Sequence, residues 1–299
     1  MMLAVTGGTG FVGNVVLRQA AEAGHRIRAL TRRAQPPRAG VDWVEGALDD
    51  ARALSRLVDG VDAVIHVAGV TTAPDRAGFA VGNIAGTQAV VTAANAAGIR
   101  RFVHVSSLAA REPGLSMYGE SKAAGERIVE GSALDWAIVR PPAIYGPGEL
   151  LDLFRMAARG FVLLPPGGRA SIVGVEDLAR LLLALASPGA PSGVLYEADD
   201  ERLNGWDHRE LARAIGDAVG RPVRPLPTPR ALMTLASLGD RMVRGKSALL
   251  TADRVRYFCH PDWTVAPARR PPPDLWRPAQ DTHAGLADTA AWYRTQGLL

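Results

Sequence analysis

The chain has 299 residues, of which 47% are hydrophobic, and its formal net charge is +4 at pH 7. This length suits one large α/β domain or a domain with a smaller lobe, and the hydrophobic content can supply a sizeable core. The arginines are scattered and form no dense basic run, so we expect no nucleic-acid partner. Cys259 is the single cysteine, which excludes an internal disulfide and a cysteine-based zinc site, and we expect no metal.

We expect no targeting signal at the beginning of the chain. An apolar run typical of a first strand starts near the second residue, which leaves no room for a signal peptide. No apolar run approaches the ~18 residues of a membrane span. We therefore expect a cytoplasmic protein that has no membrane partner and acts on a small-molecule substrate.

A glycine-rich turn follows the first expected strand, in the sequence M-L-A-V-T-G-G-T-G-F-V-G at residues 2–13. The apolar run before it predicts a buried strand, and the pattern after it predicts a helix. One glycine permits the turn, one lets a pyrophosphate approach the backbone, and one lets helix pack on strand. The helix N-terminus offers N–H groups and a positive dipole end to phosphates. This context predicts a dinucleotide site, with the candidates Gly7, Gly10, Phe11, Val12 and Gly13.

The end of the second expected strand, residues 27–30, indicates which dinucleotide is bound. An acidic residue there would bind a free ribose 2′-hydroxyl. The sequence instead has Thr31, Arg32 and Arg33. A guanidinium can bind a 2′-phosphate with two hydrogen bonds and stack on the adenine. We therefore expect NADP as cofactor, with NAD as the alternative.

Further strands are expected at 41–44, 63–67, 101–105 and 135–139, and they alternate with helical patterns. One helix runs from Asp49, as its N-cap, through Leu57, and another covers 83–97. We expect His66 to be a hydrogen-bonded core residue rather than a catalyst. Four further cofactor contacts are expected where strands end: Ala47 and Leu48 against the adenine ring, and Ala68 and Gly69 where the backbone approaches the cofactor.

The chemistry is expected after the strand at 101–105. Ser107 stands at the strand end, and Tyr118 and Lys122 lie four residues apart on a helix that runs to about Glu130, so they share one helical face. A tyrosine with its ordinary pKa of about 10 is a poor acid–base catalyst at neutral pH. A neighbouring ammonium and a positively charged nicotinamide would both lower this pKa. We expect the lysine also to hold the nicotinamide ribose, and the serine to orient the substrate oxygen.

The whole chain resembles an extended short-chain dehydrogenase/reductase. This group includes nucleotide-sugar epimerases and dehydratases, dihydroflavonol-type reductases and 3β-hydroxysteroid-type dehydrogenases. The resemblance implies that Tyr118 is the acid–base residue, Lys122 its activator and Ser107 the partner of the carbonyl, and that Asn83 supports the site. The matching stretches are T-G-G-T-G-F-V-G near the start, H-V-A-G at 66–69, N-I-A-G-T at 83–87, H-V-S-S at 104–107, Y-G-E-S-K at 118–122, R-P-P-A-I-Y-G-P-G at 140–148, V-G-V-E-D-L-A at 173–179 and the closing W-R-P-A-Q-D-T-H-A-G-L-A-D-T-A-A-W-Y.

The expected fold class is α/β, a Rossmann doubly wound parallel sheet with a smaller C-terminal substrate lobe. The NAD(P)-binding domain is expected at 1–148 plus about 170–188, and the lobe at about 149–169 plus 189–299. The loop to residue 148 should pass beside the nicotinamide, which makes Pro141 and Ile144 cofactor candidates. Further helices are expected at 150–159, 176–186, 207–219 and 230–242, with Asp177 as an acid near a helix start.

Three functions remain open from the sequence. The first is an NAD(P)-dependent oxidoreductase that interconverts a secondary alcohol and a carbonyl by hydride transfer. The second is a nucleotide-sugar epimerase or dehydratase with tightly bound NAD, for which Arg254 and Arg256 lie near the expected position of a diphosphate-binding arginine. The third is a non-catalytic NADP-sensing or scaffold protein. The helices at about 83–98 and 118–131 are candidates for a homodimer interface.

Overall fold

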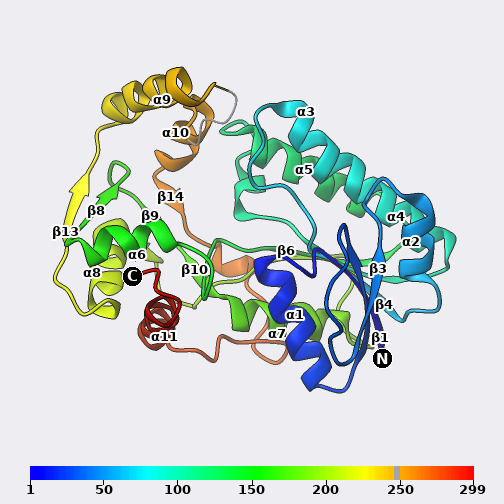
Figure 1. Cartoon of the computed structure of the whole chain (residues 1–299). Coiled ribbons are helices and arrows are strands. Elements are labelled where there is room, and N and C mark those ends of the chain that lie inside the picture. Colours follow the sequence, from blue (N-terminus) through cyan, green and yellow to red (C-terminus); the bar gives the residue numbers. More distant parts are fainter. Residues whose placement is uncertain (246–249) are drawn as a thin grey trace. The chain divides into compact units, whose positions relative to one another are not determined.

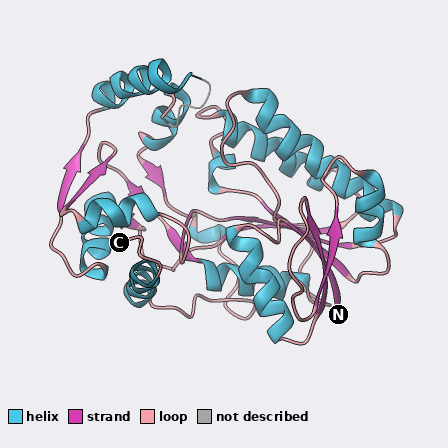
Figure 2. Cartoon of the chain, viewed as in Figure 1, coloured by secondary structure: helices cyan, strands magenta, loops and turns pink. Residues whose placement is uncertain are grey.

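A computed structural model describes residues 1–245 and 250–299 (Figures 1 and 2). The chain divides into two compact units, each assembled from separate segments. The first unit contains Met1–Arg140, Leu178–Glu197 and Pro271–Trp276. The second contains Pro141–Asp177, Ala198–Arg270 and Arg277–Leu299.

The first unit is organised around a seven-stranded sheet in which every neighbouring pair is parallel. The strand order is β11-β6-β5-β4-β1-β2-β3, so the order reverses between β1 and β4. This arrangement confirms the predicted Rossmann, doubly wound sheet, whose ligands bind at the carboxyl ends of the strands beside the reversal point. The strands are β1 Met2–Thr6, β2 Arg26–Thr31, β3 Val41–Glu45, β4 Ala63–His66, β5 Arg101–Val105, β6 Asp135–Arg140 and β11 Val194–Glu197.

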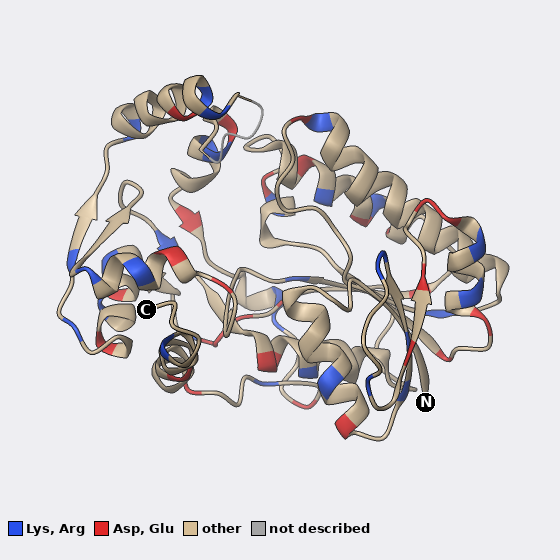
Figure 3. Cartoon of the chain, viewed as in Figure 1, with Lys and Arg blue, Asp and Glu red and all other residues tan. Residues whose placement is uncertain are grey.

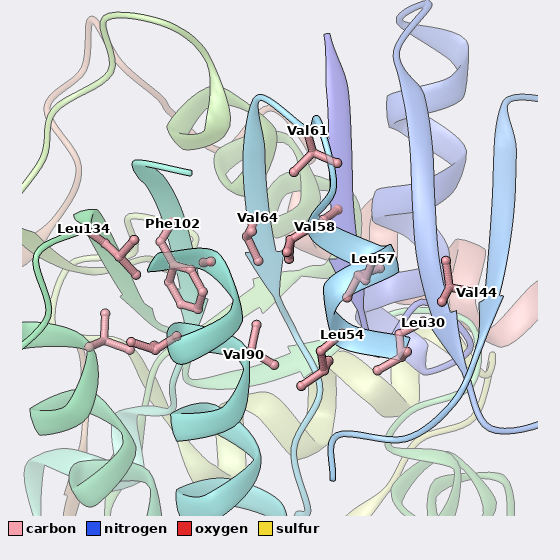
Figure 4. Packing of buried hydrophobic residues seen from close by; sticks show 14 of the residues in the cluster. Leu30, Val44, Leu54, Leu57, Val58, Val61, Val64, Val90, Phe102 and Leu134 are labelled. Atoms are coloured by element: carbon pink, nitrogen blue, oxygen red, sulfur yellow. The ribbon is translucent and has the colours of Figure 1, made fainter. Parts of the chain in front are cut away.

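Helices cover both faces of this sheet (Figure 1). The first face carries α2 (Ala51–Val58), α4 (Gly86–Ala96) and α5 (Met117–Glu130), and the opposite face carries α1 (Phe11–Glu22) and the part of α7 (Val175–Ala186) from Leu178 onward. Figure 4 shows side chains of α2 and α4 packed against those of the strands. Leu54 and Leu57 of α2 and Phe102 of β5 are almost fully buried there. Because both faces are covered, the strands are apolar along their length rather than alternating.

The second unit has its own core, built around Phe154 and Tyr293, whose rings lie 5.4 Å apart. In the described residues it contains small sheets of two or three strands rather than one large sheet (Figure 2). Its strands are β7 Ala143–Tyr145, β8 Phe161–Leu164, β9 Arg169–Ala170, β10 Ile172–Gly174, β12 Trp206–Asp207, β13 Arg224–Pro227 and β14 Asp262–Trp263. Its helices are α6 Leu151–Ala158, α8 His208–Ala218, α9 Arg230–Arg244, α10 Ala252–Phe258, the 3₁₀ turn η4 Pro267–Arg269 and α11 Thr282–Thr295.

Three local features differ from the sequence-based expectations. The N-cap of α2 is Asp50, not Asp49, because the Asp50 carboxylate accepts hydrogen bonds from the N–H groups of Arg52 and Ala53. The helix expected at 83–97 begins earlier, with α3 at Arg76–Phe79, a π-helical segment at Ala80–Ala85 (η1) and then α4. The strand β11, which pairs with β6, was not predicted.

Candidate active site

The turn between β1 and α1 brings the backbone close to the end of β4. Gly7 has φ +73°, a left-handed conformation that favours glycine, and a Cβ there would lie 2.7 Å from the amide nitrogen of Ala68. A Cβ on Gly13 would overlap the carbonyl group of Gly7. These two glycines therefore let the backbone of the turn pack closely against β4 and the start of α1. We call this turn the glycine cradle, because a turn of this kind fits the pyrophosphate of a dinucleotide.

The first turn of α1 lies directly behind this cradle. Gly10 is the N-cap of α1 and makes no side-chain cap hydrogen bond, while its own N–H donates to the carbonyl oxygen of Gly7 at 2.9 Å. Phe11 is half-buried and Val12 is buried, so these residues anchor the helix start against the sheet. The N–H groups and the positive end of the helix dipole at this position favour phosphate.

The end of β2 presents basic groups to solvent. Arg32 and Arg33 are both exposed, and the Thr31 hydroxyl donates to the carbonyl oxygen of Arg33 at 2.7 Å. This bond fixes the backbone from which the two guanidinium groups project. After the neighbouring β3, Ala47 and Leu48 are half-buried, and Leu48 lies against Gly86 of α4. The adenine-side candidates thus all lie at the carboxyl ends of β2 and β3.

Tyr118 and Ser107 meet at the carboxyl end of β5. Ser116 caps α5 by accepting a hydrogen bond from the N–H of Gly119, which places Tyr118 in the first turn. Ser107 follows β5, and its hydroxyl is hydrogen-bonded to the Tyr118 phenol. Burial raises the pKa of Tyr118, and the bond to Ser107 offsets only part of this rise. The predicted lowering of this pKa by the Lys122 ammonium and a positively charged nicotinamide together stays a prediction for the site with its cofactor bound.

Lys122 lies one turn further along α5 and is 5% exposed. Its ammonium donates a hydrogen bond to the Val105 carbonyl oxygen at 2.8 Å. Burial lowers the pKa of Lys122 to about 8, and the carboxylate of Glu126 counters part of this shift. A Cβ on Gly69 would lie 3.6 Å from Nζ of Lys122, so the small residue at the end of β4 leaves room for the ammonium.

Asn83 joins the loop after β4 to α5. Its side-chain oxygen accepts a hydrogen bond from the Val70 N–H at 2.6 Å, and its amide nitrogen donates to the Val70 carbonyl oxygen at 2.9 Å. The same amide nitrogen lies 2.8 Å from the hydroxyl of Ser121, which donates to the carbonyl oxygen of Tyr118. Asn83 belongs to the π-helical segment, a backbone irregularity that often occurs at functional sites.

The sequence analysis missed a buried ionic cluster beside these residues. The Glu126 carboxylate accepts two hydrogen bonds from Arg140 and one from the Ser106 hydroxyl. Arg140 also lies 3.7 Å from the carboxylate of Glu197 at the end of β11. One signal was present in the sequence, because Glu126 follows Lys122 by four residues and therefore lies on the same helical face.

Two histidines lie in the core behind the site. His66 is fully buried, and its ring nitrogens lie within hydrogen-bond distance of the hydroxyl groups of Thr6, at 2.7 Å, and Thr87, at 3.1 Å. Burial, and to a smaller extent the charge of Lys122, lower the pKa of His66 to about 3. His66 is therefore a neutral, hydrogen-bonded core residue, as expected. The His104 ring stacks on it at a centroid distance of 5.3 Å.

Several candidates belong to the second unit. Pro141 is buried, and Ile144 is half-buried on β7. Asp177 lies in the first turn of α7, as expected of an acid near a helix start, and its carboxylate also accepts hydrogen bonds from the N–H groups of Ala279 and Gln280. Arg254 and Arg256 lie on α10, where Arg256 pairs with Asp253 at 3.1 Å.

The strand order, the glycine cradle and the Tyr–Lys pair together define the class of NAD(P)-binding Rossmann enzymes. A family model described as NAD(P)H-binding matches residues 7–184. The chain belongs to this family, and it is an NAD(P)-dependent oxidoreductase of the extended short-chain dehydrogenase/reductase type. None of the helices in the described residues is both long and apolar enough to cross a membrane.

Named relatives agree with this assignment. The chain is 39% identical to the ceramide reductase of Caulobacter vibrioides, over 100% of this chain and 96% of that protein. It is 31% identical to the 2-alkyl-3-oxoalkanoate reductase of Stenotrophomonas maltophilia, over 90% and 93% of the two chains. The solved structure of MoeE5 in complex with UDP-glucose and NAD has a TM-score of 0.77 over 99% of both chains at 20% identity, which shows a shared fold.

Proposed function

We propose that this protein is an NADP-dependent reductase that converts a ketone of a ceramide-type lipid into a secondary alcohol. The substrate class is supported by the 39% identity to a ceramide reductase, which extends over the whole of this chain. The relative at 31% identity is a reductase of an oxoalkanoate, which also carries an aliphatic chain beside a carbonyl group. Both relatives reduce a substrate that bears a long or branched alkyl chain, and neither name refers to a nucleotide sugar.

The observation that carries the proposed chemistry is geometric, because Tyr118 lies in the first turn of α5, one helical turn before the buried Lys122 and beside Ser107. Burial raises the pKa of the phenol, which therefore carries its proton at neutral pH. A tyrosine that keeps its proton at neutral pH is a donor, and reduction of a ketone requires a proton on the developing alkoxide. Ser107, bonded to the phenol, supplies a second hydroxyl that orients the same carbonyl oxygen. Tyr118 and Ser107 therefore act as the proton donor and the orienting group.

The proposed cofactor contacts follow from the chain's own groups. Gly7, Gly10 and Gly13 cradle the pyrophosphate, and Lys122 binds the nicotinamide ribose beside Gly69. Arg32 and Arg33 bind the 2′-phosphate, which supports NADP over NAD. A bound nicotinamide supplies the hydride for the carbonyl carbon. Pro141 and Ile144 remain proposed contacts on the nicotinamide side, and we assign selection of the lipid to the second unit.

The test is to follow NADPH oxidation by the purified protein with a short-chain keto-ceramide in detergent, and to identify the product alcohol by mass spectrometry. Tyr118→Phe should abolish turnover while NADPH binding, measured by fluorescence, stays nearly unchanged. Arg127→Gln on the exposed side of α5 is the matched control and should keep full activity. The proposal fails if the keto-lipid is not reduced, or if the protein instead retains NAD and converts a UDP-sugar.

A further inference from the structure

Helix α9 exposes a continuous apolar face in the second unit. Four of the exposed apolar residues recur at intervals of three or four positions, so they follow one side of the helix, and Val243 lies next to the last of them in the sequence. Met242 is 88% exposed and Val243 is 85% exposed, which is unusual for side chains of this size. We call this face the α9 surface, and it consists of Leu232, Leu235, Leu238, Met242 and Val243.

Only a narrow side of α9 attaches it to the rest of the unit. Ser237 is the one buried residue among the fifteen of this helix, all of which are described. Met233 lies on the same side, with its sulfur 3.8 Å from the sulfur of Cys259, which follows α10. At about 100° per residue, the residues of the α9 surface lie on the side of the helix opposite to Met233 and Ser237. The α9 surface therefore faces away from this attachment.

Apolar side chains also flank the approach to α9. Leu226 of β13 and Leu163 of β8 are register partners in a parallel pair, and both are exposed. The chain enters α9 from β13 through Thr228 and Pro229, and Pro229 fixes the backbone at the N-cap. Exposed apolar groups thus also occur on the strand that leads into the helix.

Positive charge is concentrated at the two ends of α9. Arg230 lies at its first turn, and Arg241 and Arg244 lie at its last, whereas Asp240 is its single acidic residue. Figure 3 shows the ribbon of α9 without charge over most of its length and basic near its ends. Arg244 pairs with Asp240 at 3.3 Å, so the helix retains a net positive charge. An anionic partner would complement this pattern, whereas a second copy of α9 would bring like charges together.

We propose that α9 is an interfacial helix, which lies in the plane of an anionic phospholipid bilayer with the α9 surface among the headgroups and upper acyl chains. An apolar face, basic residues and modest overall hydrophobicity are the features of such helices. Its fifteen residues extend only about 22 Å, too short to cross a bilayer. The proposal replaces the expectation of no membrane partner, which considered only membrane-spanning segments.

The choice of a bilayer rests in part on the proposed function, because a ceramide-type lipid is dissolved in membranes rather than in water. An enzyme attached to the bilayer through α9 can take up its substrate without transferring it through water. Basic residues near an anionic surface contribute about 1 kcal/mol each to such attachment. The interaction is therefore expected to be reversible and to weaken with salt.

Vesicle flotation tests the proposal with the full-length protein, without cofactor or substrate. Vesicles of phosphatidylcholine mixed with phosphatidylglycerol should bind the protein at low salt, and vesicles of phosphatidylcholine alone should bind it much less. The double variant Leu235→Ser/Met242→Ser should lose at least about tenfold in affinity for the mixed vesicles. Leu203→Ser, at a residue that is 80% exposed outside α9, is the matched control.

The basic residues have a separate test. Arg230→Gln/Arg241→Gln should reduce binding to the anionic vesicles and its salt dependence, whereas Arg209→Gln on α8 should change neither. All variants should keep the wild-type Tm and the wild-type rate on a short-chain ketone in detergent. Absence of vesicle binding, or equal binding by the α9 variants, would overturn the proposal. A concentration-dependent dimer that the double variant abolishes would also overturn it and assign the surface to a second copy.

These outcomes are independent of the proposed reaction. Vesicle binding without keto-lipid turnover would leave the α9 proposal standing and remove the proposed function. Turnover in detergent without vesicle binding would leave the proposed function standing and remove the α9 proposal. When both hold, the α9 double variant should slow reduction of a keto-lipid embedded in vesicles and leave the rate in detergent unchanged.

Discussion

Arg140, the last residue of β6, donates hydrogen bonds from Nε and Nη2 to the two carboxylate oxygens of Glu126, at 2.7 and 2.6 Å. Glu126 lies one helical turn after Lys122 on α5 and also accepts a 2.5 Å hydrogen bond from the Ser106 hydroxyl. This bidentate ion pair connects the helix that carries Tyr118 and Lys122 to the strand ends beneath the site. It is therefore in a position to fix the distance between Ser107 and the Tyr118 phenol.

Glu126→Gln should impair both stability and catalysis. Loss of the charge removes the group that raises the pKa of Lys122, so this pKa should fall below about 8. If turnover requires the protonated ammonium of Lys122, the alkaline limb of the pH–rate profile should move to lower pH. The free energy of unfolding should decrease by up to roughly 3–5 kcal/mol, because Arg140 loses its closest partner. Glu130→Gln, exposed one turn further on, is the control, and an unshifted profile for Glu126→Gln would refute the coupling.

Arg32→Gln/Arg33→Gln should change the cofactor preference. Loss of charge-assisted hydrogen bonds to the 2′-phosphate should weaken NADPH binding by about ten- to a hundredfold, and NADH binding should change little. Fluorescence titration with each cofactor measures the two dissociation constants. Arg26→Gln at the opposite end of β2 should leave both unchanged. Equal losses for NADPH and NADH would show that the arginines do not bind the phosphate.

Lys122 should make stability depend on pH in alkaline solution. Its pKa is lowered from 10.5 in an unfolded chain to about 8 in the folded one, so between these values the unfolded state binds more protons. Stability from this group therefore rises as the pH increases from 8 to 10.5. Relative to Lys122→Met, the wild-type free energy of unfolding should increase by about 3 kcal/mol over this range. Urea unfolding at several pH values measures the difference, and a constant difference would contradict the lowered pKa. Arg127→Met should show no such change, because arginine stays charged.

The local part of the site could be predicted from the sequence. Tyr118 and Lys122 lie on one helical face because they are four residues apart, which does not depend on the tertiary structure. Ser107 follows a strand, and ligands of a parallel sheet bind at the carboxyl ends of its strands. The pairing of Glu126 with Arg140 could not be predicted, because it depends on the rotation of α5 relative to β6. The rise in the pKa of Tyr118 that burial causes could not be predicted either, because a sequence does not specify burial.

The contrast between local patterns and contacts of residues distant in the sequence also explains why the strand β11 and the helical segment α3 were not predicted. The strand β11 has only four residues after a Pro- and Gly-rich segment, so its pattern is too short to recognise. It is defined by parallel pairing with β6. The early helical segment at Arg76–Phe79 contains a glycine and has little local tendency to form. It is held by Arg76, which pairs with Glu120, and by Phe79, whose ring lies 6.1 Å from that of Tyr118. These contacts come from residues distant in the sequence.

Asn83→Leu should disconnect the loop after β4 from α5. The substitution keeps the size of the side chain but leaves the Val70 N–H and carbonyl oxygen without their partner, and each buried unpaired group costs about 1–3 kcal/mol. Amide exchange in the peptide around Val70 should accelerate, and kcat should fall because Ser121, which bonds the Tyr118 carbonyl oxygen, also loses a partner. Asn83→Asp keeps the acceptor for the Val70 N–H and should retain protection of that amide, while kcat still falls. Asn95→Asp on the exposed side of α4 is the control, and unchanged exchange in Asn83→Leu would show that Asn83 does not hold this loop.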